Sequence, residues 1–113
     1  MFKTYLIIAL SFISFVVVAS EIEIPHLLQR GNAEAGADLV ATCAACHGAA
    51  GQSINSDWPN LAGQNQRYLA DQLKYYQQSQ RESPLMGAVI PYLKTLSDKQ
   101  LLDIAAFYNS QPL

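Results

Sequence analysis

The stretch ATCAACHGAAG, residues 41–51, contains both cysteines of the 113-residue chain, Cys43 and Cys46, and one of its two histidines, His47. Residues three and four apart lie on one side of an α-helix, so a helix through this stretch brings the two thiols and the imidazole together. C-x-x-C-H is the attachment pattern of c-type haem, in which both sulfurs form thioethers and the histidine binds iron. The stretch therefore predicts one covalent haem c, bound through Cys43 and Cys46, with His47 as a metal ligand.

C-x-x-C also occurs in three other kinds of site, and the sequence agrees less well with each of them. A thioredoxin-like dithiol places C-x-x-C at the start of a helix in an α/β fold, whereas these cysteines are expected at a helix end in a chain without strands. A structural zinc site needs four ligands, and beyond the motif the chain offers only His26. A disulfide would close a very short loop, add little stability and leave His47 unexplained. Haem is favoured because it accounts for all three residues.

Residues 1–20 have the pattern of a secretory signal peptide. Lys3 precedes an almost uncharged apolar run, and small residues close the segment. The run is about 15 residues long, short of the roughly 20 that a bilayer-spanning helix needs, and a retained membrane anchor is the alternative. We expect cleavage after Ala19 or Ser20, a periplasmic location, and a single domain over residues 21–113.

The charge balance excludes one large class of partner. The formal net charge is −2, and removal of the segment containing Lys3 makes it −3. Nucleic-acid-binding domains are basic, so nucleic acid is not an expected ligand. Export would also place the two thiols in an oxidising compartment, where they would be open to disulfide formation unless other chemistry uses them.

The quoted motif lies at the end of a predicted helix over residues 33–46. Asn32 is a favourable N-cap, Glu34 places negative charge in the first turn, and Gly48 follows the last turn. Residues 48–63 are rich in Gly, Ser, Asn and Pro and predict a loop. The motif is therefore expected where a helix gives way to a long loop.

A second helix is predicted over residues 65–79, because apolar side chains recur there at helical spacing. Those side chains are Tyr68, Leu69, Leu73 and Tyr76. Residues 84–95 are expected to be irregular or to form a short helix, with Pro91 as a further breaker.

The last helix has the clearest signature. Ser97 followed by Gln100 is a capping box. One apolar stripe follows it, formed by Leu101, Ile104, Ala105 and Tyr108. Since no segment shows the alternation of a strand, the fold class is predicted to be all-α.

Met86 is the candidate for the second face of the iron. Apart from the initiator it is the only methionine, and it lies in SPLMGAV, where Pro84 biases the backbone away from helix and Gly87 permits close approach. Histidine and methionine together raise the reduction potential and are typical of electron-transfer cytochromes. Met86 as ordinary core filler is one alternative. His26 as the second ligand is the other.

With these residues in place, the chain resembles a class I c-type cytochrome of the short bacterial mono-haem form, similar to the cytochrome c-four-like and c-553-like group. The similarity extends from GNAEAGADLVATCAACHG through WPNLAGQNQRYLADQLKYY to LSDKQLLDIAAFYNSQ. The chain departs from the tandem members of that group in having a single C-x-x-C-H motif. The resemblance implies a cytochrome c fold, with N- and C-terminal helices crossing around one covalent haem.

The resemblance also implies roles for individual residues. Pro59 and Leu61 match the family's Pro-x-Leu element, in which the proline carbonyl accepts a hydrogen bond from the ligand histidine and the leucine packs on the haem. Gly36, Phe107 and Tyr108 match the crossing of the two terminal helices.

Four residues are weaker candidates near the haem. Trp58 is considered for its edge, and three basic residues are considered for its propionates, namely Arg67, Lys74 and Arg81. Each basic residue is also explained as an ordinary solvated surface residue.

The expected function is single-electron transfer without catalysis, since iron with two protein ligands has no open position for substrate. The expected partners are redox proteins: a membrane quinol-oxidising complex, a terminal oxidase or a periplasmic dehydrogenase. The membrane itself is expected to be contacted only through partners or an uncleaved leader. The alternatives are a cytochrome subunit of a dehydrogenase or oxidase complex, and a five-coordinate haem protein that binds gases or acts on peroxide.

Overall fold

The computed structural model describes residues 30–113, so the signal-peptide prediction and His26 lie outside the described residues. In this part of the chain all regular structure is helical, as predicted. The elements are α1 (Ala33–Ala37), α2 (Ala41–His47), α3 (Gln66–Gln77), the 3₁₀ turn η1 (Met86–Ala88), α4 (Ile90–Leu93) and α5 (Asp98–Ser110). No helix within residues 30–113 has the length and apolar character needed to cross a membrane.

The prediction of one continuous helix over residues 33–46 was wrong. The structure has two short helices, α1 and α2, separated by a turn in which the Leu39 N–H donates to the Gly36 carbonyl. Val40, just before α2, is buried, and the Leu39 carbonyl accepts a 2.7 Å hydrogen bond from the Tyr92 hydroxyl. Tertiary packing therefore stabilises a break in an alanine-rich segment for which the sequence predicted one helix.

The crossing of α1 and α5 is confirmed. A Cβ built on Gly36 would lie 2.0 Å from the Asp103 carbonyl oxygen, so the two backbones are in direct contact at this glycine. The buried Asp103 carboxylate accepts a 2.7 Å hydrogen bond from the Asn32 N–H and pairs with Lys99. The start of α1 is thereby fixed to the middle of α5.

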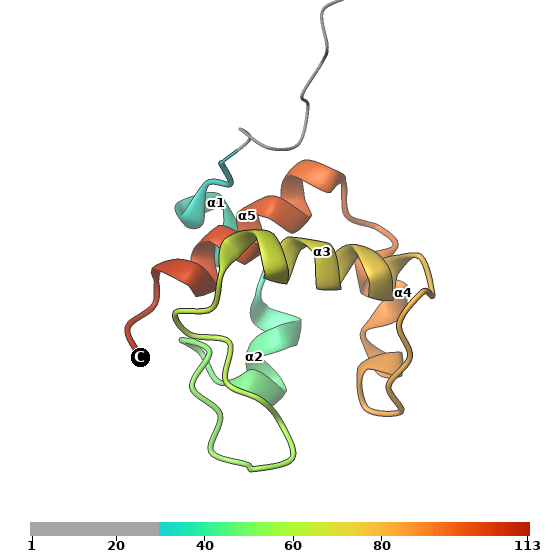
Figure 1. Ribbon diagram of the computed structural model, residues 1–113, viewed down its shortest axis with the longest axis horizontal. Helices are drawn as coiled ribbons and strands as arrows, with labels where there is room; N and C mark the ends of the chain where they lie inside the picture. The colour runs from blue at the N-terminus through green and yellow to red at the C-terminus, as the bar shows by residue number, and fades with distance from the viewer. Residues whose placement is uncertain (1–29) are drawn as a thin grey trace, which may run out of the picture.

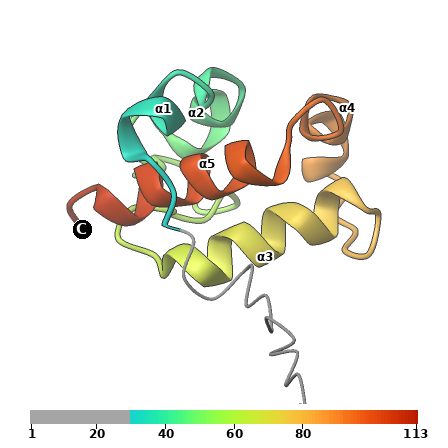
Figure 2. The same ribbon diagram turned by 90° about the horizontal axis from the view of Figure 1, so that it is seen from above.

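Helix α5 lies between α1 and α3 and forms the centre of the domain (Figure 2). Its predicted apolar stripe is fully buried; the members are Leu101, Ile104, Ala105 and Tyr108. Helix α3 begins at its Asn65 cap, close to the predicted boundary, and packs Leu69 and Tyr76 into the same core. In Figure 1, α2 and the segment around α4 lie apart on one side of the α3–α5 pair.

The segment that returns from α3 to α5 contains short helices, one of the two outcomes expected for residues 84–95. Met86 begins the η1 turn instead of lying in extended chain, and the Gly87 N–H donates to the Ser83 carbonyl. Pro91 does not break α4 but occupies its first turn, where a missing N–H costs no hydrogen bond. No chain atom lies within 4 Å of a Cβ built on Gly87, so the protein's own packing does not require glycine there.

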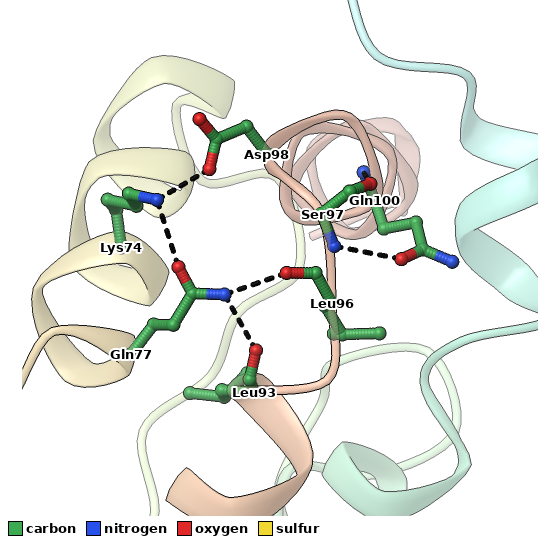
Figure 3. A network of polar contacts seen from close by, with 7 residues as sticks. All are labelled: Lys74, Gln77, Leu93, Leu96, Ser97, Asp98 and Gln100. Atoms are coloured by element: carbon green, nitrogen blue, oxygen red, sulfur yellow. Dashed lines mark hydrogen bonds and ion pairs between the residues drawn. The ribbon is translucent and has the colours of Figure 1, made fainter.

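The capping box of α5 is confirmed. The Ser97 hydroxyl accepts from the Gln100 N–H at 3.2 Å, and the Gln100 side chain accepts from the Ser97 N–H at 2.9 Å (Figure 3). We expect Ser97→Ala to lower the free energy of unfolding by about 1 kcal/mol, because the Gln100 N–H in the first turn loses the hydroxyl that accepts its hydrogen bond. Chemical denaturation of the haem-loaded protein measures this loss. Ser97→Thr keeps the oxygen and should lose less; equal losses would contradict the capping explanation.

Candidate functional site

A cavity of about 420 Å³ lies between α2, α3, α5 and the segment that contains Met86. Cys43, Cys46 and His47 line it from α2, and Met86 lines it from η1. The predicted attachment motif and the predicted second ligand are separated by about 40 residues in sequence but share this cavity. Its volume lies within the range of ordinary cofactor and ligand sites.

The His47 ring has a fixed orientation. Its Nδ1 lies 2.8 Å from the Pro59 carbonyl oxygen, the contact that the Pro-x-Leu resemblance implied. A carbonyl only accepts hydrogen bonds, so Nδ1 carries the hydrogen and donates it. The lone pair then resides on Nε2, the nitrogen left free to bind a metal. The side chain is buried, so this hydrogen bond is little exposed to competing water.

The two cysteines are free thiols, with Cys43 buried and Cys46 exposed. Burial raises the pKa of the Cys43 thiol, and the nearby Tyr108 hydroxyl offsets this only in part. A redox-active dithiol needs a thiol with a lowered pKa, so the thioredoxin-like alternative is not supported. Among residues 30–113, no three Cys, His, Asp or Glu side chains are grouped so as to hold a metal ion, and the zinc alternative finds no site there.

The cavity walls are largely apolar. Met86 is half-buried, and Leu61 and Trp58 also line the cavity, as the resemblance and the sequence suggested. Tyr68, Leu73 and Ile104 extend the apolar wall along α3 and α5. Apolar walls with a few fixed polar groups are typical of sites that bury a large flat cofactor.

Of the three basic candidates, only Arg81 lines the cavity. Its guanidinium carbon lies 4.9 Å from the centroid of the Tyr76 ring, and it donates a hydrogen bond to the Gln72 side chain. Arg67 pairs with Asp71 one turn away on α3. Lys74 pairs with Asp98 of α5, so both agree with their interpretation as surface residues.

The Tyr108 hydroxyl is the functional feature that sequence reasoning missed. The predicted stripe placed the tyrosine in the core, but its oxygen is buried and has no hydrogen-bond partner among the described residues, while the residue also lines the cavity. Burial, with a further contribution from nearby Cys43, raises the pKa of this hydroxyl, so it stays protonated. The only sequence signal was a polar-tipped aromatic in an otherwise aliphatic stripe.

These observations fit a bound haem. Two free thiols and a histidine with Nε2 available stand on one wall, and a thioether sulfur stands on another. A buried hydroxyl without a hydrogen-bond partner is rare in native proteins. The Tyr108 hydroxyl is therefore consistent with a bound group in this cavity. An imidazole and a thioether that can bind iron, with two thiols that can attach the porphyrin, are the groups that haem c requires.

Comparison with known proteins agrees with this fit. The family model "Cytochrome c" matches residues 33–111. Cytochrome c-554(548) of Halomonas halodenitrificans is 43% identical over 81 residues, which make up 72% of this chain and 98% of that protein. Cytochrome c4 of Pseudomonas aeruginosa is 42% identical over 83 residues, which make up 74% of this chain and 40% of that protein.

Solved structures show the same relationship. Reduced recombinant cytochrome c4 from Pseudomonas stutzeri has a TM-score of 0.67 and 41% sequence identity, over 73% of this chain and 46% of that one. The chain thus matches nearly the whole of cytochrome c-554(548) but less than half of each of these two cytochrome c4 proteins. On this fold, this cavity and these matches, the chain belongs to the cytochrome c family, whose haem c is held covalently, here through Cys43 and Cys46.

Proposed function

We propose that the protein carries single electrons on a haem whose iron is bound by His47 on one face and Met86 on the other. The observation that carries the proposal is the shared cavity, in which the fixed imidazole and the only methionine of residues 30–113 both take part. Haem iron supplies a ferric/ferrous couple at such a site, and a methionine ligand raises its potential. Electron transfer is also the activity of the cytochrome c family, to which the chain belongs.

The chain's own residues would act by holding the site still. The Pro59 carbonyl fixes the His47 ring, so the imidazole needs no reorientation when the iron changes oxidation state. Leu61, Leu73 and Ile104 line the cavity and would keep water away from a bound haem, and a low-polarity environment favours the less charged, reduced state. With protein ligands on both faces, no coordination position remains for a substrate, and the protein itself would not be an enzyme.

Redox proteins are the partners that this chemistry requires. We place them in the periplasm, because residues 1–20 carry a signal-peptide pattern and residues 21–113 suffice for a single haem domain. A membrane quinol-oxidising complex, a terminal oxidase or a periplasmic dehydrogenase would each fit as donor or acceptor. Short-lived encounters over small interfaces suit a carrier that must leave after each transfer.

Visible spectra of the haem-loaded protein test this proposal. We expect sharp low-spin bands, the weak long-wavelength ferric band of methionine ligation, and no change when carbon monoxide is added to the reduced protein. A high-spin spectrum that shifts with carbon monoxide would instead show an open iron position. That result would return Met86 to the role of core residue and favour a gas-binding or peroxidatic function.

A further inference from the structure

The side chain of Gln77 joins three helices beside the Met86 segment. Its Nε2 donates to the Leu93 carbonyl at 2.7 Å and to the Leu96 carbonyl at 2.8 Å (Figure 3). Gln77 is the last residue of α3, Leu93 ends α4, and Leu96 immediately precedes the cap of α5. One amide group thus connects the end of α3 to the chain that returns from Met86.

The orientation of this amide is fixed from its other side. Lys74 Nζ donates to Gln77 Oε1 at 3.0 Å, and the same ammonium pairs with Asp98 (Figure 3). An ammonium only donates and the two carbonyls only accept, so a flipped amide would lose all three hydrogen bonds. The protein's own contacts therefore direct the Gln77 amide N–H groups at the Leu93 and Leu96 carbonyls.

Residues 78–97, here called the Met86 loop, are attached to α3 at both ends. At the outgoing end, Arg81 lies over the Tyr76 ring and hydrogen-bonds to Gln72. At the returning end, the attachment is the pair of hydrogen bonds from Gln77. Between them Met86 is only half-buried, so its position in the cavity depends on how firmly the two ends are held.

We propose that Gln77 is a positioning residue for Met86, which holds the returning end of the Met86 loop against α3 so that the methionine sulfur stays at the iron. This inference rests on the proposed ligation by Met86. Without the Gln77 amide, the Leu96 carbonyl loses its side-chain donor in the closed loop, and the Leu93 carbonyl keeps only the N–H of Leu96. Water can satisfy those carbonyls when the loop opens, so the variant favours the form in which Met86 has left the iron.

The test measures how easily an added ligand replaces Met86. Imidazole is titrated into the ferric haem-loaded protein and into Gln77→Leu, with the methionine band and the unfolding midpoint recorded for each. We expect the apparent imidazole affinity of Gln77→Leu to rise about five- to thirtyfold, the range that corresponds to losing one or two hydrogen bonds from the closed form. The methionine band should weaken in the same variant.

Two control variants separate positioning from general destabilisation. Gln78→Leu makes the same replacement one residue later, at an exposed position. Asn32→Ala removes the α1 cap, whose Oδ1 accepts from the Ala35 N–H at 3.0 Å outside the Met86 loop, and lowers global stability by a comparable amount. Both should change the imidazole affinity less than twofold.

Each outcome bears on one claim. An affinity increase in Asn32→Ala as large as that in Gln77→Leu, at equal loss of stability, would overturn the positioning role and leave Met86 ligation intact. An unchanged imidazole affinity in Gln77→Leu would likewise overturn the positioning role of Gln77 without affecting the Met86 assignment. A wild-type protein without the methionine band would overturn the ligand assignment itself, and this inference with it.

Discussion

Met86→Leu is expected to leave the protein folded but to open one face of the haem iron. Leucine has nearly the volume of methionine and no sulfur, so packing of the loop should cost less than about 1.5 kcal/mol. The proposed iron ligand, by contrast, is removed completely. We expect the reduced variant to bind carbon monoxide, and its reduction potential to fall by on the order of 0.1 V, part of the roughly 0.8 V over which axial ligands set haem potentials.

Carbon monoxide difference spectra and a redox titration measure these two changes. Gln80→Leu is the control, since it places a leucine at an exposed position of the Met86 loop that does not line the cavity, and it keeps the methionine sulfur. It should keep its potential and remain unreactive to the gas. If Met86→Leu kept the wild-type potential and did not bind carbon monoxide, Met86 would be a core residue, and the second iron ligand would have to come from another part of the chain.

Gly36→Ala is expected to have the largest effect on stability. The new methyl group would stand 2.0 Å from the Asp103 carbonyl oxygen and 2.9 Å from the Phe107 Cβ, so α1 must move away from α5. Overpacking commonly costs 1–3 kcal/mol, and a clash with backbone cannot be relieved by a rotamer change, so we expect a loss of about 3 kcal/mol or more. For a domain of this size that corresponds to a decrease in Tm of more than about 10 °C.

Thermal unfolding of the haem-loaded protein measures this effect. Ala37→Val adds more bulk one residue later in α1, but at an exposed position, and should shift Tm by only a few degrees. A Tm for Gly36→Ala within that small range would show that the two helices can separate at little cost. The close crossing would then not be a stabilising element of the fold.

Several elements were readable from the sequence because their causes are local. The capping box at Ser97 and Gln100 and the stripe that follows it depend on residues within a few positions of one another, and the structure contains both. The same holds for the Asn32 cap. The C-x-x-C-H spacing is local as well, and it predicted the cofactor before any fold was known.

Other features were predicted wrongly because the contacts that stabilise them come from residues distant in the sequence. The break between α1 and α2 falls at residues 38–40, inside an alanine-rich segment that follows a favourable N-cap. It is supported by the burial of Val40 and by a hydrogen bond from Tyr92, more than 50 residues away. Pro91 was predicted to interrupt structure but lies in the first turn of α4. Propensity is a weak signal that tertiary contacts readily override.

The sequence by itself determined that the domain is helical and that one haem c is attached at Cys43 and Cys46, because helix periodicity and thioether attachment each need only neighbouring residues. Only the tertiary structure decided which groups meet around the cavity: the Pro59 carbonyl on His47, the unpartnered Tyr108 hydroxyl, and the Gln77 amide behind the Met86 loop. These arrangements depend on how elements from different parts of the chain pack together, which no short stretch of sequence encodes.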